Sequence, residues 1–172
     1  MLGTLDWGPA NERHDLLAAP VAGAIGTLTE AEVAEIDPEL ADTAAFCERY
    51  DVPLDASANC VVVAAKRGGE VSYAACMILA TGRADVNGIV RKHLGTRKVS
   101  FAPMADATSL TSMEYGGITP VGLPEDWPIL VDEAVAAVPH AVIGSGLRRS
   151  KLLLPGKALA TLSGAQVLAL AQ

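Results

Sequence analysis

The stretch from Gly116 to Gly122 holds the residue types in this chain that best suit chemistry on a bound carbonyl group. It reads Gly-Gly-Ile-Thr-Pro-Val-Gly. Glycine has no Cβ, so its backbone N–H can approach a ligand closely, and proline restrains the loop so that such donors stay aimed. Backbone donors held in this way stabilise an oxyanion. The stretch predicts either a backbone oxyanion site or, as in most Gly/Pro loops, a structural turn.

Side chains in and beside this loop are candidate substrate-binding groups, because they combine hydroxyls with an apolar wall. They are Thr111, Met113, Ile118, Thr119, Pro120 and Gly122. For Met113 the alternative is simple packing beneath the pocket.

A second glycine-rich turn, Gly144-Ser145-Gly146, shortly precedes the basic run Arg148-Arg149-Ser150-Lys151. Backbone N–H groups in such a turn can cradle a phosphate, and Lys151 can supply a cation from the following strand. The alternative is a solvated basic turn.

Three cysteines, Cys47, Cys60 and Cys76, form an odd set with no CxxC pair, and no histidine lies at a ligand-like spacing from them. We therefore expect neither a disulfide framework nor a metal site, and no cofactor. The sequence also shows no His–Asp or paired-carboxylate arrangement for general base catalysis.

The order of motifs resembles one family. Thr111 to Pro124 (Thr-Ser-Met-Glu-Tyr-Gly-Gly-Ile-Thr-Pro-Val-Gly-Leu-Pro), then Ile-Leu-Val-Asp132, then Val-Ile-Gly-Ser-Gly146, is similar to the YbaK/prolyl-tRNA-synthetase-associated domain family of aminoacyl-tRNA deacylases. The segment Gly116 to Gly122 resembles that family's GGxSPxG loop. The resemblance covers about residues 43–170.

This resemblance implies a trans-acting deacylase that hydrolyses the ester between a mischarged amino acid and the terminal adenosine of a tRNA. It implies that backbone amides around Gly116 and Gly117 hold the aminoacyl carbonyl and that a substrate hydroxyl or thiol accepts the proton from water. The partner would be tRNA, with neither DNA nor a membrane involved. The sequence leaves the oligomeric state open.

The chain departs from the family at one position. The family carries a lysine at the start of the first hairpin strand, and alignment through the helix after Asp85 places Cys60 there, or Val61 in a register shifted by one residue. Lys66 lies about 20 Å farther along the strand at roughly 3.3 Å per residue, too far to replace the family lysine.

Three interpretations of this departure stay open. Cys60 is a catalytic nucleophile or, as for most buried thiols without an activating neighbour, inert. Lys151 supplies the cation from a neighbouring strand. In the third interpretation the chain has kept the pocket and lost the activity, which makes it a binding module for an aminoacyl-adenosine or nucleotide-like ligand.

Charge is distributed unevenly along the 172 residues, whose net charge is -7. Residues 1–58 carry twelve acids and two bases, whereas residues 59–172 carry eight acids and eleven bases. Because residues 59–172 are mildly basic, the composition is compatible with a nucleic-acid partner. A basic patch in this part is formed by Arg91-Lys92-His93 and Arg97-Lys98. With 51% hydrophobic residues and no apolar run of the length of a membrane span, we expect a cytoplasmic protein.

Local patterns predict the elements that must position these residues. Helices are expected from the capping box at Thr29 to about Ile36, over Thr43–Tyr50 after a cap at Asp42, from Asp85 to Gly95, from Asp106 to about Met113, from Asp132 and from Pro155. Strands are expected at Cys60–Lys66 and Val71–Leu79 as a hairpin, then at Lys98–Phe101, Ile129–Val131, Ala141–Ile143, Lys151–Leu154 and near Val167.

Short strands interleaved with helices, without a regular βαβ repeat, predict an α+β fold with a curved, barrel-like mixed sheet and surrounding helices. We expect residues 1–28 to be an N-terminal extension and residues 29–172 a single domain.

Overall fold

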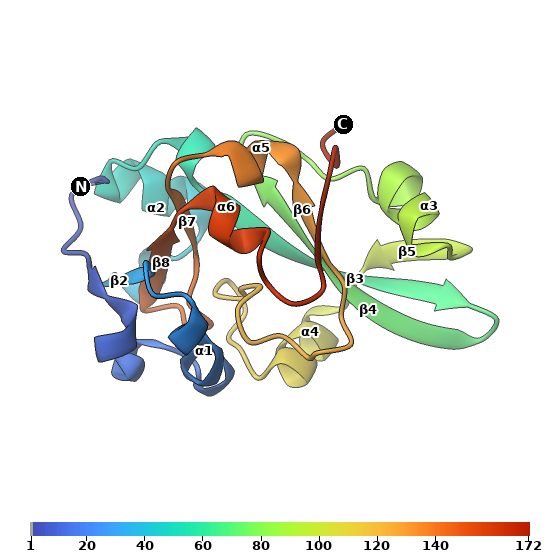
Figure 1. The fold of residues 1–172 in the computed structure, drawn as a ribbon, viewed down its shortest axis with the longest axis horizontal. Coiled ribbons are helices and arrows are strands. Elements are labelled where there is room, and N and C mark those ends of the chain that lie inside the picture. Colours follow the sequence, from blue (N-terminus) through green and yellow to red (C-terminus); the bar gives the residue numbers. More distant parts are fainter. Residues whose placement is uncertain (1) are drawn as a thin grey trace.

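A computed structural model describes residues 2–172. Its strands form two sheets (Figure 1). The first has the order β1-β2-β8-β7, with strands Gly8–Pro9, Glu32–Glu35, Ser150–Leu154 and Ala141–Gly144. The second has the order β5-β3-β4-β6-β9, with strands Lys98–Phe101, Ala58–Arg67, Glu70–Leu79, Ile129–Asp132 and Ala165–Leu168.

Helices surround these sheets. They are α1 (Ala19–Ala24), α2 (Thr43–Tyr50), α3 (Arg91–Leu94), α4 (Met104–Thr111), α5 (Glu133–Ala137) and α6 (Gly156–Leu159). A π-helical turn, Val86–Val90, leads into α3. No helix within residues 2–172 is both long and apolar enough to cross a membrane.

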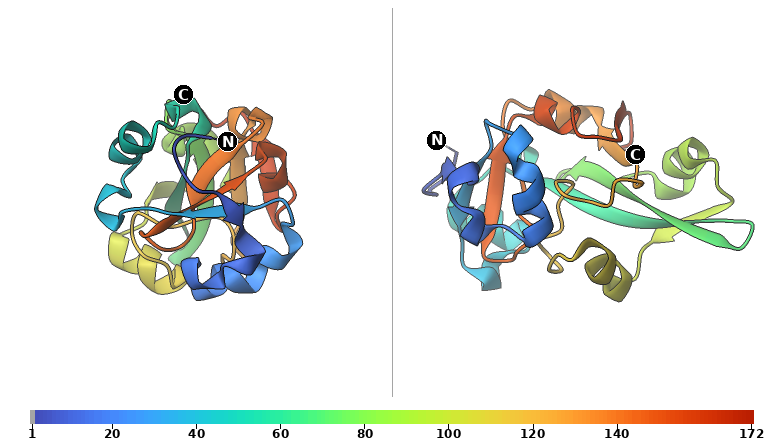
Figure 2. Two further views of the ribbon diagram at one scale, coloured as in Figure 1. Left: turned by 90° about the vertical axis from the view of Figure 1, so that its left-hand side faces the viewer. Right: turned by 60° about the horizontal axis from the view of Figure 1, so that its bottom comes forward.

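The second sheet is mixed, because β5, β3 and β4 pair antiparallel whereas β4, β6 and β9 run parallel. The α+β prediction is therefore confirmed. Over residues 2–172 both sheets are open rather than closed into a barrel, and a parallel bridge between Ser57 and Val142 links them. The first sheet lies at one end of the elongated molecule, and the β3–β4 hairpin projects at the other (Figures 1 and 2).

The hairpin forms as the sequence predicts. Gly68 and Gly69 both have positive φ, +57° and +85°, which suits a tight turn between twisted antiparallel strands. Asp85 caps the next helical segment by accepting hydrogen bonds from the N–H groups of Gly88 and Ile89, and Gly95 ends it in the left-handed conformation.

Two predicted helix starts are wrong. Glu32–Glu35 is not helical but pairs as strand β2 between β1 and β8, because Val33 and Ala34 bury their side chains in that sheet and this packing outweighs the capping box at Thr29. Helix α4 begins at Met104 rather than after Asp106, with Pro103 at the cap position.

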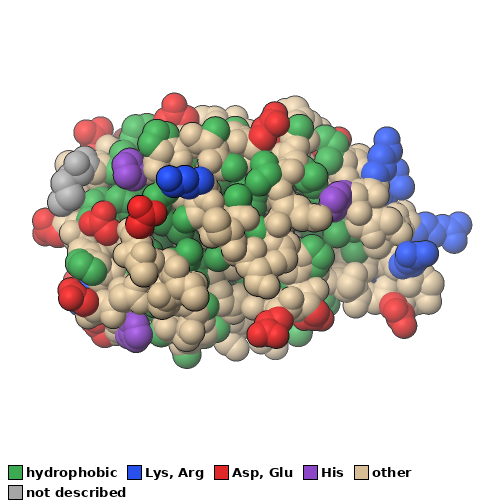
Figure 3. Space-filling view, viewed as in Figure 1, with side chains coloured by type: hydrophobic (Ala, Val, Ile, Leu, Met, Phe, Trp, Pro, Cys, Tyr) green, Lys and Arg blue, Asp and Glu red, His purple; other side chains and the backbone are tan. Residues whose placement is uncertain are grey.

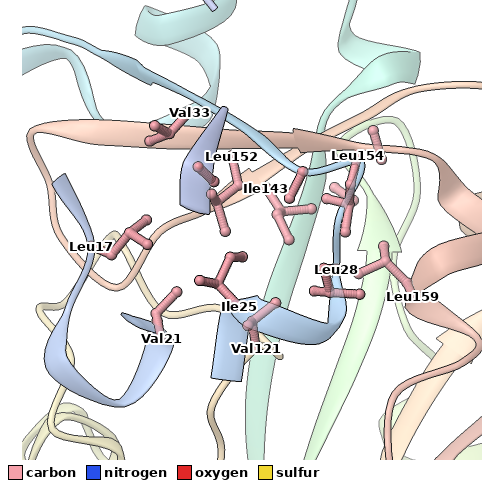
Figure 4. Packing of buried hydrophobic residues seen from close by; sticks show 14 of the residues in the cluster. Leu17, Val21, Ile25, Leu28, Val33, Val121, Ile143, Leu152, Leu154 and Leu159 are labelled. Carbon is pink, nitrogen blue, oxygen red and sulfur yellow. The ribbon is translucent and has the colours of Figure 1, made fainter. Parts of the chain in front are cut away.

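The largest cluster of buried side chains joins the N-terminal segment to the first sheet and extends to β4, β6, α5 and α6. Figure 4 shows Leu17, Val21, Ile25 and Leu28 converging on strand residues such as Leu152. Residues before 29 thus supply buried side chains to the core, while the division of the chain at residue 28 stays a prediction.

Candidate functional site

A cavity of about 470 Å³ lies where the two sheets meet. The Ser57–Val142 bridge brings the first residues of β3 beside β7, so that both sheets contribute to its wall. Its lining includes Asp42, Thr43, Asn59, Cys60, Val62, Phe101, Tyr115, Gly116, Ile118, Gly144 and Lys151. The cavity therefore combines a loop, strand backbones and one cation.

Lys151 reaches this cavity from the middle of the first sheet. In the register of β8 it lies opposite Gly144 on one side and Ala34 on the other, two small residues that leave room for its stem. The side chain is 8% exposed, and its ammonium donates a hydrogen bond to the carbonyl of Ala41 at 3.0 Å and lies 5.2 Å from the centre of the Phe46 ring. Burial lowers the pKa of Lys151 to about 8. The ammonium makes no other hydrogen bond within residues 2–172, so donors remain for a ligand.

Cys60 lines the same cavity from β3 and is partly buried. Burial, and to a smaller extent the neighbouring Cys76, raises the pKa of its thiol well above the ordinary range. A thiol of this kind is protonated at neutral pH and is a weak nucleophile.

The glycine-rich loop is held against the β7–β8 turn by close backbone contacts. The N–H of Gly117 donates to the carbonyl of Glu114 at 3.0 Å, and the carbonyl of Gly117 accepts from the N–H of Gly146 at 2.7 Å. A Cβ on Gly144 would overlap the carbonyl oxygens of Gly117 and Ile118, and one on Gly117 would lie 2.8 Å from the Leu147 backbone. Only glycine permits this approach.

These contacts separate the two glycines that the sequence groups as oxyanion donors. The Gly117 amide is used within the loop, and Gly117 is not part of the cavity wall. Gly116 and Ile118 do line the cavity, and their amides have no hydrogen-bond acceptor within residues 2–172.

Arg148 fastens the other side of the loop. Its guanidinium donates to the carbonyl of Tyr115 at 3.0 Å and to that of Pro38 at 3.1 Å, and it lies 3.8 Å from the carboxylate of Asp42. Asp42 occupies the N-cap position of α2, but its side chain makes no capping hydrogen bond, contrary to our prediction. Gly116, with φ of +89°, provides the space that the guanidinium occupies.

The structure brings together five of the residues singled out from the sequence: Cys60, Gly116, Ile118, Gly144 and Lys151. The other candidates, Thr111, Met113, Gly117, Thr119, Pro120, Gly122, Ser145 and Gly146, do not line this cavity.

Several of these candidates are engaged in the layer behind the wall. The Thr111 hydroxyl donates to the carbonyl of Ala107 at 2.6 Å. Ser145 is fully buried, its hydroxyl lies 2.6 Å from that of Ser150, and its carbonyl accepts from the N–H of Ala18. The N-terminal segment thus covers the turn that the sequence suggests as a phosphate cradle.

Sequence reasoning missed a polar pair in the wall, because nothing in the linear sequence places its members together. Thr43 Oγ1 donates to Asn59 Oδ1 at 2.7 Å, which joins the start of α2 to the start of β3. It also missed the exposed ring of Phe101, which together with Tyr115 puts aromatic surface on the cavity wall; the two residues are 67% and 53% exposed.

Comparison with known proteins gives sequence relatives and fold relatives. Two proline–tRNA ligases, from Streptococcus suis strains 05ZYH33 and 98HAH33, are each 35% identical to the chain over 68 residues, which is 39% of this chain. The match spans only 11% of the length of each ligase.

Among solved structures, one described as a candidate trans-editing enzyme for prolyl tRNA synthetase superposes with a TM-score of 0.77 at 22% identity, covering 90% of this chain and 96% of that one. The crystal structure of hypothetical protein APE2540 superposes with a TM-score of 0.78 at 19% identity, covering 89% and 99% of the two chains. At this identity the likeness shows a shared fold.

The profile of the aminoacyl-tRNA editing domain family matches residues 37–162, which contain the glycine-rich loop, β3 and Lys151. This match covers most of the chain and agrees with the fold of the candidate trans-editing enzyme. The protein therefore belongs to the aminoacyl-tRNA editing domain family.

Proposed function

We propose that this protein is a trans-acting aminoacyl-tRNA deacylase, which hydrolyses the ester of mischarged tRNA in the cavity between its two sheets. The observation that carries the proposal is the position of Lys151, a nearly buried cation in the wall of the same cavity as Gly116 and Cys60. The resemblance places Cys60, or Val61 in the shifted register, where the family carries a lysine, and Lys151 would supply a cation to the same cavity from the other sheet.

Ester hydrolysis needs stabilisation of the negative charge that develops on the carbonyl oxygen when water attacks. We assign the amides of Gly116 and Ile118, which have no hydrogen-bond acceptor within residues 2–172, and the ammonium of Lys151 to this charge. In a site shielded from water such preorganised donors contribute strongly, and removal of one oxyanion donor typically costs roughly 10²–10³ in rate.

The remaining steps follow from the balance of the reaction. A bond forms between the water oxygen and the carbonyl carbon, and the bond between that carbon and the ribose oxygen breaks. A hydroxyl or thiol of the substrate accepts the proton from water and passes its own proton to the departing ribose oxygen, so that the free amino acid and the 3′-terminal hydroxyl of the tRNA are released. The ammonium of Lys151, which is protonated below about pH 8, stabilises the negative charge on the carbonyl oxygen through these steps.

The aromatic surface of the wall suits the terminal adenosine. Phe101 comes from the end of β5 and Tyr115 from the loop after α4, and both expose much of their ring surface. Base–aromatic stacking contributes roughly 1–3 kcal/mol per base, so these rings supply a platform for the adenine.

The test is release of the amino acid from a panel of mischarged tRNAs, beginning with tRNA for proline because the sequence relatives are proline–tRNA ligases. We expect release above the uncatalysed rate by the protein and a loss of at least tenfold in the Lys151→Met variant. Lys157→Met, at an exposed lysine outside the cavity, is the matched control and should keep full activity.

The competing hypothesis is a binding module that retains the pocket without the reaction. If no ester is cleaved above background while a non-hydrolysable aminoacyl-adenosine analogue binds in a manner sensitive to Phe101→Ala, the deacylase proposal fails and the binding module stands. The Lys151 ammonium favours hydrolysis, because a binding pocket for a neutral ester gains little from a cation held at a desolvation cost.

A further inference from the structure

Positive charge gathers at the end of the molecule opposite the first sheet. Figure 3 shows Lys and Arg side chains clustered there, on the region of the β3–β4 hairpin, β5 and α3. The cations of this end are Lys66, Arg67, Arg91, Lys92, Arg97 and Lys98, and all except the partly buried Arg91 are exposed. They are six of the thirteen Lys and Arg residues in a chain whose net charge is -7.

These cations are not neutralised by neighbouring acids. No salt bridge to any of them occurs within residues 2–172. Residues 59–105 contain only two acids, Glu70 opposite Arg67 in the hairpin and Asp85, whose carboxylate caps the π-helical turn.

Lys66 and Lys98 are the most informative pair in this end. They lie directly opposite each other on the antiparallel strands β3 and β5. Like charges in this arrangement destabilise a sheet, so folding alone does not favour two lysines here. A partner with negative charge offsets their repulsion.

The pair also lies on the face of the sheet that leads to the cavity. Side chains alternate along a strand, so Lys66 shares a face of β3 with Cys60 and Val62, two residues of the cavity wall. The neighbouring residues Val63 and Ala65 pack on the opposite face with the helical segment that ends in α3. From Val62 to Lys66 the distance along the strand is about 13 Å at roughly 3.3 Å per residue.

We propose that the Lys66–Lys98 pair, within this basic end, binds phosphates of the tRNA acceptor stem while the aminoacylated end occupies the cavity. The inference rests on the proposed deacylase function. A phosphate chain that leaves the cavity toward the hairpin passes over Ala107 and Trp127, which bury Val62 on this face, before it meets the two ammonium groups. The remaining cations of this end raise the local potential.

The experiment compares two substrates and two double variants. The substrates are a mischarged full-length tRNA and an aminoacylated trinucleotide that carries only the terminal CCA sequence. The variants are Lys66→Gln/Lys98→Gln and, as a control with the same change in net charge, Arg49→Gln/Lys157→Gln, which changes exposed cations outside the basic end. Binding of uncharged tRNA is measured by fluorescence anisotropy over a salt series.

For the Lys66→Gln/Lys98→Gln variant we expect a higher KM for full-length tRNA, unchanged hydrolysis of the trinucleotide, and a salt-dependence slope reduced by roughly one per lysine removed. The control should keep the slope of the unaltered protein. The inference is overturned if both variants weaken tRNA binding equally or if neither changes the slope. Failure to cleave either substrate would instead refute the deacylase function, and the binding slopes would still test the phosphate contact.

Discussion

Lys151 and Cys60 lie on strands of different sheets, yet both line one cavity. The bridge between Ser57 and Val142 brings β3 against β7, and Lys151 lies opposite Gly144 of β7 in the adjacent strand. Lys151 is therefore brought to the cavity by the sheet that does not contain Cys60.

Replacement of Lys151 by methionine should lower activity at least tenfold without loss of stability. Methionine fills a similar volume and removes the cost of burying the charge, which offsets the lost hydrogen bond to the Ala41 carbonyl. We expect a Tm equal to or above that of the unaltered protein, together with the loss of ester hydrolysis. A lower Tm with a parallel loss of activity would indicate that Lys151 serves the fold alone.

The pH dependence should report the titration of Lys151. Because burial lowers its pKa to about 8, the ammonium form is present below that value, and kcat/KM corrected for uncatalysed hydrolysis should fall as the pH rises through about 8. The residual rate of the Lys151→Met variant should lack this inflection. Between about pH 8 and 10.5 the unfolded state binds more protons, so the free energy of unfolding should rise with pH in that window.

Substitution of Cys60 by alanine should leave most of the activity. Its thiol is held protonated by burial, so no thiolate is available at neutral pH. Amino-acid release by Cys60→Ala should stay within a few-fold of the unaltered rate, and iodoacetamide should not inactivate the protein through this residue. Loss of activity of the size found for Lys151→Met would point to covalent catalysis instead.

The substitution Gly144→Ala should displace the glycine-rich loop, which packs against Gly144, and so distort the cavity wall. The added Cβ would overlap the carbonyl oxygens of Gly117 and Ile118, and overpacking of this kind costs roughly 1–3 kcal/mol. We expect a lower Tm and slower hydrolysis. Gly23→Ala is the matched control, because a Cβ there meets nothing within 4 Å and α1 should gain stability from it. Equal effects of the two substitutions would contradict the role of the close approach.

The Lys66–Lys98 pair makes a prediction about stability that is independent of tRNA. Lys98→Thr removes the cross-strand repulsion and puts a β-branched residue in β5, so the free energy of unfolding should rise by roughly 0.2–1 kcal/mol at low salt. Thermal denaturation at low and high salt measures it, and the gain should shrink as salt screens the repulsion. A destabilised Lys98→Thr variant would show that other contacts hold this lysine.

The sequence predicts the hairpin, the Asp85 helix and the family, because local turn chemistry and a distinctive loop carry that information. It does not predict strand β2, since Val33 and Ala34 are buried only once β8 lies beside them. The sequence also does not predict that the Gly117 N–H is used within the loop, because its hydrogen bond to the Glu114 carbonyl depends on the turn that the chain makes between these residues. Lys151 and Cys60 line one cavity because the two sheets pack in a particular relative position, and no local sequence pattern encodes that position.

The cavity forms only when both sheets are present and linked at the bridge between Ser57 and Val142, because both contribute residues to its wall. Neither sheet alone encloses the cavity, so a chain in which only one sheet has formed has no complete site. Any ligand that binds this cavity therefore stabilises the docked arrangement of the two sheets.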